Sequence, residues 1–154
     1  MKRLVQRRSL LPVLAALCMV LALCPGVTPS SRARAGSGSL VELSGRVYEG
    51  EVGDESLPVP GVTVQLYGSM NQGYLGEQVA TFTTDRSGWY GLTVPEAPTW
   101  EFLNIVETIP AGYGAVDATT VDGVVVDPTW IQYAYPLTRK ILTGNKFWLQ
   151  LREP

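Results

Sequence analysis

The hydrophobic pattern after residue 39 has a period of two residues, which is the spacing of a β-strand. In 62–67, for example, every second residue is Val or Leu, and Thr, Gln and Tyr stand between them. Segments 79–84 and 102–107 repeat this spacing and are rich in residues that suit a pleated surface. The pattern predicts seven strands, near 40–48, 61–67, 77–84, 89–94, 101–108, 122–126 and 145–151.

Turn-forming residues separate the predicted strands. Pro58–Gly61 precede one strand, and Asp85–Gly88 are typical of a tight hairpin loop in which Gly88 takes a positive φ. No helical stripe of useful length occurs after residue 35. Seven short strands with frequent turns favour an all-β fold, a single antiparallel β-sandwich over 40–152. The pattern does not determine the strand register between Gly114 and Lys140.

The first 35 residues have the order of a secretory signal peptide. Basic residues between Lys2 and Arg8 precede a continuous apolar run from Leu10 to Cys24, and residues 33–35, Ala-Arg-Ala, offer a small-x-small cleavage site. The apolar run is shorter than the roughly 20 residues that a spanning helix needs. We therefore expect cleavage rather than a membrane anchor, and no membrane span in the mature chain.

Two export routes stay open. Residues 6–11, Gln-Arg-Arg-Ser-Leu-Leu, resemble a twin-arginine signal, although adjacent arginines also occur in signals of the general Sec route. Residues 21–24, Leu-Ala-Leu-Cys, resemble a lipobox, but Leu23 is large for the position before the cysteine, which disfavours lipoprotein anchoring. Residues 36–39 are expected to form a flexible linker. Either route predicts a secreted, extracellular protein.

Charge and residue usage exclude several function classes. Residues 1–35 hold six of the twelve basic residues and no acidic ones, so the remaining chain, with fourteen acidic residues, has a net charge of −8. That charge disfavours nucleic acid and anionic lipid as partners. The chain has no histidine, and Cys18 and Cys24 both lie in the apolar run. With no His-dependent triad, thiolate nucleophile or phosphate loop, we assign no catalytic residue and predict no enzyme.

The order of four motifs resembles a known family. They are Gly45–Tyr48 (GRVY), Pro60–Leu66 (PGVTVQL), Thr83–Tyr90 (TTDRSGWY) and Val106–Tyr113 (VETIPAGY). In this order they resemble the B-type domains of Gram-positive surface adhesins, namely the serine-aspartate repeat B domain and the collagen-adhesin B domain. The broader class is the transthyretin-like (prealbumin), or carboxypeptidase-regulatory-like, sandwich. Residues 144–147 also resemble the closing strand of the serine-aspartate version.

The resemblance implies a non-catalytic structural or adhesive module: a stalk, a spacer or a protein-docking sandwich. Its partners would be an extracellular protein or a polysaccharide. The oligomeric state, the ligand and the attachment to a cell are not predicted.

The family's intramolecular isopeptide bond needs a first-strand lysine, a last-strand Asn or Asp, and a buried acid. The resemblance places Glu107 at the acid position and makes Asn145 the candidate acceptor. The predicted first strand, 40–48, contains Arg46 but no lysine, and a guanidinium is not a usable nucleophile. We therefore predict no isopeptide bond, and we expect Glu107 to be a strand-end carboxylate that is hydrogen-bonded to a nearby turn.

Calcium is the second chemistry that the resemblance implies, in the loop after the first strand. Four carboxylates stand there within seven residues: Glu49, Glu51, Asp54 and Glu55. They could supply the oxygen ligands that calcium requires, but the regular spacing of a calcium loop is absent. A solvated acidic loop is the favoured alternative, and no other metal or cofactor is predicted.

An aromatic segment between two prolines suggests an alternative function. In extended chain, Tyr133 and Tyr135 would share one face with Ile131, and Trp130 would share the other with Gln132. Exposed aromatic rings beside polar groups stack on sugars or anchor a protein interface. A carbohydrate-binding accessory domain that uses Trp130, Tyr133 and Tyr135 is therefore the alternative to a structural module, and packing in the core is the alternative role for these rings.

Overall fold

The computed structural model describes residues 39–96 and 99–153, so the predicted signal peptide and most of the predicted linker lie outside the described residues. The described chain forms strands and loops, without a helix. Its nine strands are β1 (Leu40–Glu49), β2 (Thr63–Ser69), β3 (Glu77–Thr83), β4 (Trp89–Pro95), β5 (Phe102–Thr108), β6 (Tyr113–Thr119), β7 (Val124–Asp127), β8 (Trp130–Ala134) and β9 (Ile141–Leu151). Among these residues, no helix is long and apolar enough to cross a membrane.

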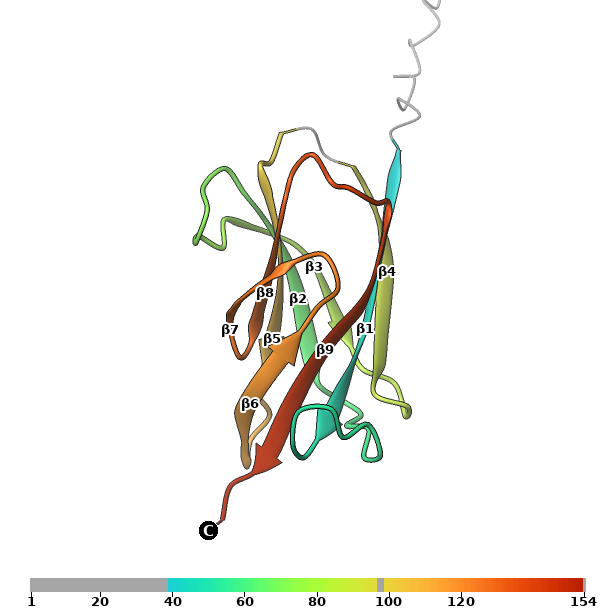
Figure 1. The fold of residues 1–154 in the computed structure, drawn as a ribbon, viewed down its shortest axis with the longest axis vertical. Helices are drawn as coiled ribbons and strands as arrows, with labels where there is room; N and C mark the ends of the chain where they lie inside the picture. Colours follow the sequence, from blue (N-terminus) through green and yellow to red (C-terminus); the bar gives the residue numbers. More distant parts are fainter. Residues whose placement is uncertain (1–38, 97–98, 154) are drawn as a thin grey trace, which may run out of the picture. The chain divides into compact units, whose positions relative to one another are not determined.

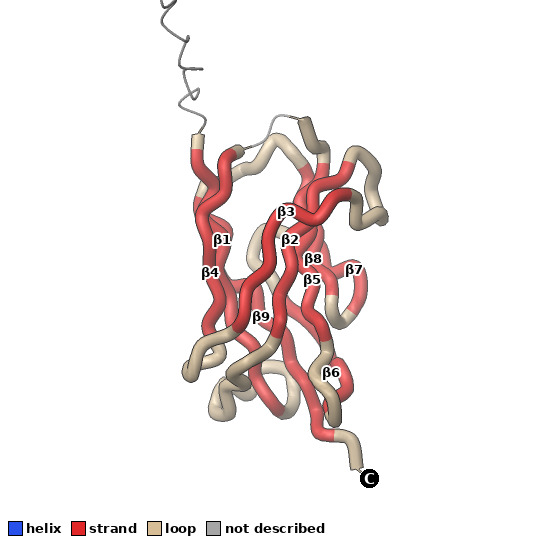
Figure 2. Tube along the Cα trace, turned by 180° about the vertical axis from the view of Figure 1, so that it is seen from behind, coloured by secondary structure: helices blue, strands red, loops and turns tan. Residues whose placement is uncertain are grey.

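The strands form two sheets that pack face to face (Figures 1 and 2). The four-stranded sheet has the order β4-β1-β9-β6, and the five-stranded sheet has the order β3-β2-β5-β8-β7. Alternate residues of both sheets point inward, which is why the two-residue period predicts the fold. In β1, for example, Val41, Leu43 and Val47 are fully buried. The predicted all-β sandwich is confirmed.

Two of the nine strands were not predicted, β6 and β8. In β8, consecutive residues Ile131, Gln132 and Tyr133 are all buried, because the loop after β2 covers the outer face of this strand and donates the Gly73 N–H to Gln132. A strand that is buried on both faces loses its alternating pattern. The β6 residues are mostly half-buried, so they show no clear alternation either.

Two details of the predicted antiparallel arrangement are wrong. Strands β1 and β9 pair in parallel, with Val47 opposite Phe147, while the other strand pairs are antiparallel. The loop Asp85–Gly88 is a tight turn with Gly88 at φ 68°, as predicted, but it does not close a hairpin. It carries the chain from β3 in one sheet to β4 in the other, so the two flanking strands do not pair.

A β-bulge in β9 determines which side chains of that strand reach the core. The register between β1 and β9 shifts between the Leu43–Leu142 pair and the Gly45–Asn145 pair, so that one residue of β1 faces two of β9. Gly144 lies in the bulge with φ 79°, a conformation that favours glycine. Leu142 and Asn145 are three positions apart and would otherwise point to opposite faces, but both are buried.

Candidate functional site

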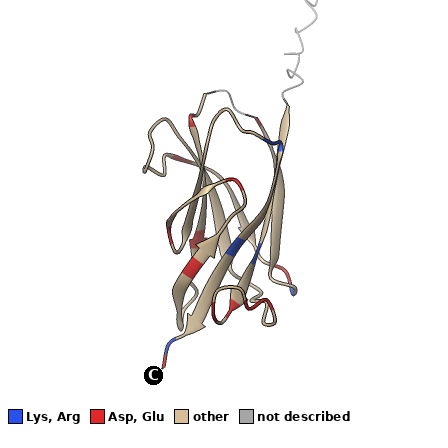
Figure 3. Ribbon diagram, viewed as in Figure 1, with Lys and Arg blue, Asp and Glu red and all other residues tan. Residues whose placement is uncertain are grey.

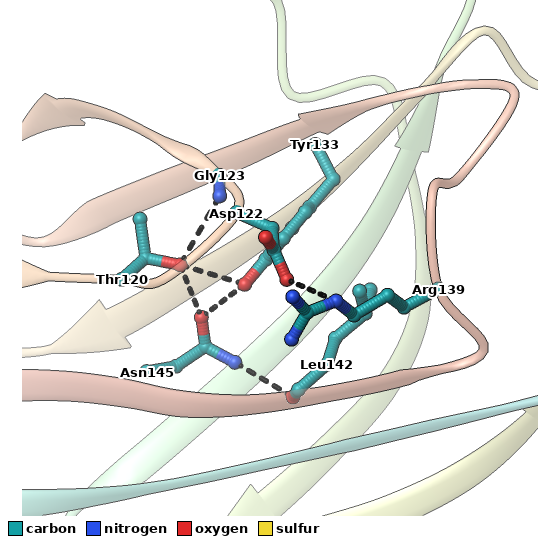
Figure 4. A network of polar contacts seen from close by, with 7 residues as sticks. All are labelled: Thr120, Asp122, Gly123, Tyr133, Arg139, Leu142 and Asn145. Atoms are coloured by element: carbon teal, nitrogen blue, oxygen red, sulfur yellow. Dashed lines mark hydrogen bonds and ion pairs between the residues drawn. The ribbon is translucent and has the colours of Figure 1, made fainter.

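A polar network lies in the interior of the sandwich, around Asn145 of β9 (Figure 4). The hydroxyl groups of Tyr133 and Thr120 lie 2.5 and 3.0 Å from Asn145 Oδ1, and 2.7 Å from each other. Asn145 Nδ2 donates to the carbonyl oxygens of Ser44 at 3.1 Å and Leu142 at 3.0 Å. All hydrogen-bonding atoms of this amide are therefore engaged, although Asn145 is fully buried.

The network connects the two sheets. Tyr133 belongs to β8 of the five-stranded sheet, whereas Asn145 and Ser44 belong to the four-stranded sheet. Thr120 follows β6, where the chain turns toward β7, and Gly123 N–H donates to its hydroxyl at 3.3 Å. Burial is the main cause that raises the pKa of Tyr133. The network therefore consists of neutral groups whose hydrogen bonds connect the two sheets.

Glu107 of β5 is another buried polar residue, and its surroundings differ from the prediction. Its side chain is 3 % exposed, and neither carboxylate oxygen has a hydrogen-bond partner among the described residues. The expected hydrogen bond to a turn does not form with any residue of 39–96 or 99–153. Burial raises its pKa to about 8, so this carboxyl is mainly protonated at neutral pH.

Tyr90 lies beside both buried groups and fills the space over Gly45 of β1. Its hydroxyl donates to the Asn145 carbonyl oxygen at 3.3 Å, and burial, with the nearby Tyr133 and Glu107, holds its pKa well above the usual value. A β-carbon at Gly45 would overlap both the Tyr90 phenol and that carbonyl oxygen. Gly45 is also the residue of β1 opposite Asn145. The structure thus places a tyrosine ring, not a long side chain from β1, next to Asn145.

The acidic loop after β1 folds over the outer face of the four-stranded sheet, where most of its candidate calcium ligands contact other side chains. Glu55 forms an ion pair with Lys146 and accepts the Tyr48 hydroxyl at 3.0 Å. Asp54 accepts the Ser56 N–H at 2.9 Å. The Trp148 indole, which stacks on Tyr48, donates to the Asp54 carbonyl oxygen.

Glu49, a further candidate ligand, accepts the Tyr113 hydroxyl at 2.9 Å. Glu51 lies exposed in the same loop. Within 39–96 and 99–153, no three acidic, His or Cys side chains converge on a position for a metal ion. The loop therefore covers the stacked aromatic pair Tyr48 and Trp148.

The three aromatic residues that suggested sugar binding do not form one exposed surface. Tyr133 points into the core and is 3 % exposed. Trp130 points to the outer face of its sheet, is half-buried, and donates its indole N–H to Asn104 Oδ1 at 3.0 Å. Tyr135 is half-buried beyond the end of β8, and its hydroxyl has no partner among the described residues.

The sequence reasoning named Asn145 and Glu107 but missed Tyr90, Thr120 and the network role of Tyr133. Tyr90 ends one of the four motifs, but its contact with Asn145 depends on the pairing of β1 with both β4 and β9. Thr120 lies in the segment whose register was not predicted. No local signal marks these residues, because the network joins positions up to 101 residues apart.

Comparisons with known proteins support the fold. No protein-family model matches this sequence, and no curated protein sequence matches it. Among solved structures, a double mutant of the shaft pilin SpaA from Lactobacillus rhamnosus GG has a TM-score of 0.50 and 14 % identity, over 74 % of this chain. The match covers 51 % of the SpaA chain, so this chain corresponds to about half of it.

Two further structures match more weakly. The Bacillus anthracis TIE protein has a TM-score of 0.44 and 17 % identity, over 72 % of this chain and 18 % of its own. The major pilin SpaD from Corynebacterium diphtheriae has a TM-score of 0.44 and 16 % identity, over 73 % of this chain and 31 % of its own. At this level of identity the SpaA match shows the fold alone, and the predicted β-sandwich is confirmed.

Proposed function

We propose that residues 40–152 form a secreted, non-catalytic structural module, a spacer or stalk segment that bears tension outside the cell and contacts an extracellular protein or polysaccharide. Export is supported by the signal-like order of residues 1–35, and the acidic charge of the remaining chain suits a soluble extracellular protein.

The observation that carries this proposal is the parallel pairing of the first and last strands. Glu42 pairs with Ile141 near the start of both strands, and Glu49 pairs with Leu149 near their ends. The chain therefore enters the sandwich at one end and leaves at the opposite end (Figure 1). The eleven residues of β9 span about 35 Å. A module of this shape adds nearly its full length to a chain of modules.

The same pairing suits the module to tension. A force on the two ends pulls β1 and β9 in opposite directions along their common axis, so it loads all hydrogen bonds between them at once. The Asn145 amide adds a side-chain hydrogen bond to Ser44 at the bulge, where the register of the ladder shifts. This side-chain hydrogen bond thus joins the two strands that would bear the force.

Single-molecule force spectroscopy on residues 36–154 tests the proposal. Attachment at Ser39 and Arg152 should load the β1–β9 ladder in shear and require a high unfolding force. Attachment at Tyr113 and Leu151, which are paired at one end of the β6–β9 ladder, should peel these strands apart one bond at a time at a several-fold lower force. Equal forces in both geometries would overturn the tension-bearing role.

The alternative function, a carbohydrate-binding domain that uses Trp130, Tyr133 and Tyr135, is not favoured by an observation of its own. Burial of Tyr133 leaves no face of that ring for a sugar.

A further inference from the structure

A hollow of about 310 Å³ opens on the outer face of the four-stranded sheet. Its small residues are Ser44, Gly45 and Gly144, and larger side chains surround them: Arg46, Tyr48, Glu55, Trp89 and Lys146. The hollow exists because positions 44 and 144, at the β-bulge, carry little or no side chain where their neighbours along the strands carry large ones.

Three of these side chains form a row across adjacent strands. Arg46 of β1 is paired with Trp89 of β4 on one side and with Lys146 of β9 on the other. Neighbouring strands lie about 4.8 Å apart. An aromatic ring, a guanidinium group and an ammonium group therefore follow one another at this spacing along one side of the hollow.

The tryptophan in this row is held in place yet open to solvent. Its indole lies over the backbone of Gly91, in the space that a β-carbon at that position would occupy. Trp89 is nevertheless 43 % exposed, whereas Trp100 and Trp130 are half-buried and Trp148 is buried. A ring that is positioned by a glycine and still accessible offers a stacking surface without needing the fold to rearrange.

The charge at this hollow is opposite to that of the protein around it. Residues 36–154 carry fourteen acidic and six basic residues, and two of the six basic ones line the hollow. Figure 3 shows basic positions side by side on β1 and β9 in a mostly uncharged sheet. Lys146 is paired with Glu55, whereas Arg46 is exposed and forms no ion pair with the described residues. The hollow therefore has one cation to offer to an anionic ligand.

We propose that this hollow binds an acidic polysaccharide, through a sugar ring that stacks on Trp89 and a ring carboxylate that pairs with Arg46. A guanidinium binds a carboxylate with two parallel hydrogen bonds, and the strand spacing places it beside the ring that holds the sugar. Ser44, which also lines the hollow, supplies a hydroxyl group for a further sugar oxygen. This site lies apart from Trp130, Tyr133 and Tyr135, and it does not depend on the tension-bearing role.

An acidic peptide strand fits the hollow less well. Peptides that bind to sheets add to an exposed edge, where backbone N–H and C=O groups are unpaired. The hollow lies over β1, whose two edges are already paired with β4 and β9. Its surroundings hold charged and hydroxyl groups rather than an apolar pocket for a peptide side chain. A stacked, hydroxylated ring with a carboxylate matches this set of groups.

Isothermal titration calorimetry of residues 36–154 with oligogalacturonate tests the proposal, with fully methyl-esterified oligogalacturonate as the uncharged probe. We expect binding to the acid form that weakens as salt rises, because salt screens the exposed Arg46. Trp89→Ala and Arg46→Gln should each weaken binding about tenfold or more. Tyr74→Ala and Arg139→Gln, which remove an exposed ring and an exposed cation elsewhere, should leave it unchanged.

For a further variant, we expect affinity to rise rather than fall. Glu55→Gln removes the one negative charge that lines the hollow and frees Lys146, and its amide oxygen still accepts the Tyr48 hydroxyl. Affinity for the acid form should rise several-fold. Absence of binding to the acid form, equal binding of the methyl ester, or full binding by Trp89→Ala or Arg46→Gln would each overturn the proposal. If an Asp-rich peptide binds and the saccharide does not, the hollow would be assigned to a protein partner instead.

Discussion

Asn145 makes hydrogen bonds with residues of both sheets, so the effect of its substitution measures how strongly the interior network holds the layers together. Its amide oxygen accepts from hydroxyl groups and its amide nitrogen donates to two carbonyl oxygens. Each buried partner that loses its hydrogen bond costs about 1–3 kcal/mol.

Asn145→Ala should lower the free energy of unfolding by about 3 kcal/mol, because it removes the side-chain donor to the Ser44 carbonyl oxygen and the acceptor shared by the Tyr133 and Thr120 hydroxyls, which then have only each other. Asn145→Asp should be at least as destabilising, since it places carboxylate oxygen against two carbonyl oxygens. Urea denaturation monitored by tryptophan fluorescence measures both. A decrease in the free energy of unfolding of less than about 1 kcal/mol would contradict a stabilising role for this network.

Glu107 provides a pH-dependent prediction. Its pKa is about 8 in the folded protein against 4.5 for an ordinary glutamate, because burial disfavours the charged form. The folded state then binds more protons than the unfolded state between these two values. Stability is therefore fullest below pH 4.5 as far as this group is concerned, and it falls as pH rises through about 8.

Glu107→Gln should remove most of this fall, which amounts to several kcal/mol at about 1.4 kcal/mol for each pKa unit. The acids whose pKa values are lowered, Asp54, Glu55, Asp85 and Glu96, lose their contribution only under more acidic conditions. Denaturation between pH 5 and pH 9 thus isolates Glu107. Parallel pH profiles for wild type and variant would show that the carboxyl is not buried as described.

At the scale of elements, the bulge in β9 couples backbone conformation to the interior network. Gly144 takes φ 79°, and a β-carbon there would lie 2.9 Å from Val121 Cγ2. The bulge is what allows Leu142 and Asn145 to face the same way. Its loss would therefore alter the network as well as the ladder.

Gly144→Ala should cost about 2 kcal/mol or more, from the left-handed conformation and the contact with Val121 together. Gly112→Ala is the matched control, because Gly112 has a similar φ of 85° and no atom within 4 Å of an added β-carbon. It should cost only the conformational part. Thermal denaturation of both variants measures these costs. Equal losses of stability in Gly144→Ala and Gly112→Ala would mean that the bulge position has no special role.

The acidic loop after β1 provides a second prediction at this scale. Glu49 and Glu55 accept hydrogen bonds from tyrosines of the sheet, and Glu55 also pairs with Lys146. A calcium ion would have to compete with these contacts. We therefore expect the melting temperature to be the same in calcium and in EDTA. A melting temperature several degrees higher in calcium would support calcium binding instead.

At the scale of the whole molecule, the contacts around Gly45 bear on covalent cross-linking. Tyr90 occupies the space between β1 and Asn145, and β1 contains no lysine. The purified protein should therefore have the mass of its sequence after signal cleavage, without the loss of ammonia that an isopeptide bond between lysine and asparagine produces. Intact-mass spectrometry checks this, and a mass lower by one ammonia would contradict it.

The amino-acid sequence is sufficient to predict the fold class, because side chains that alternate along a strand must alternate between core and solvent. Seven of the nine strands follow from this pattern, and so does the positive φ of Gly88. Motif order also identified Glu107 and Asn145 as residues of interest, although not their surroundings.

Which of these residues contact one another depends on how the strands pair and pack. The parallel pairing of β1 and β9 and the hydrogen bond from Asn145 to Ser44 join segments about 100 residues apart. Whether Asp85–Gly88 closes a hairpin or crosses between the sheets depends on which strands pair with β3 and β4. The burial of β8 on both faces depends on a loop from another part of the chain. Local periodicity records which way a side chain points, but its neighbours across a sheet and between sheets are set by how the strands pack.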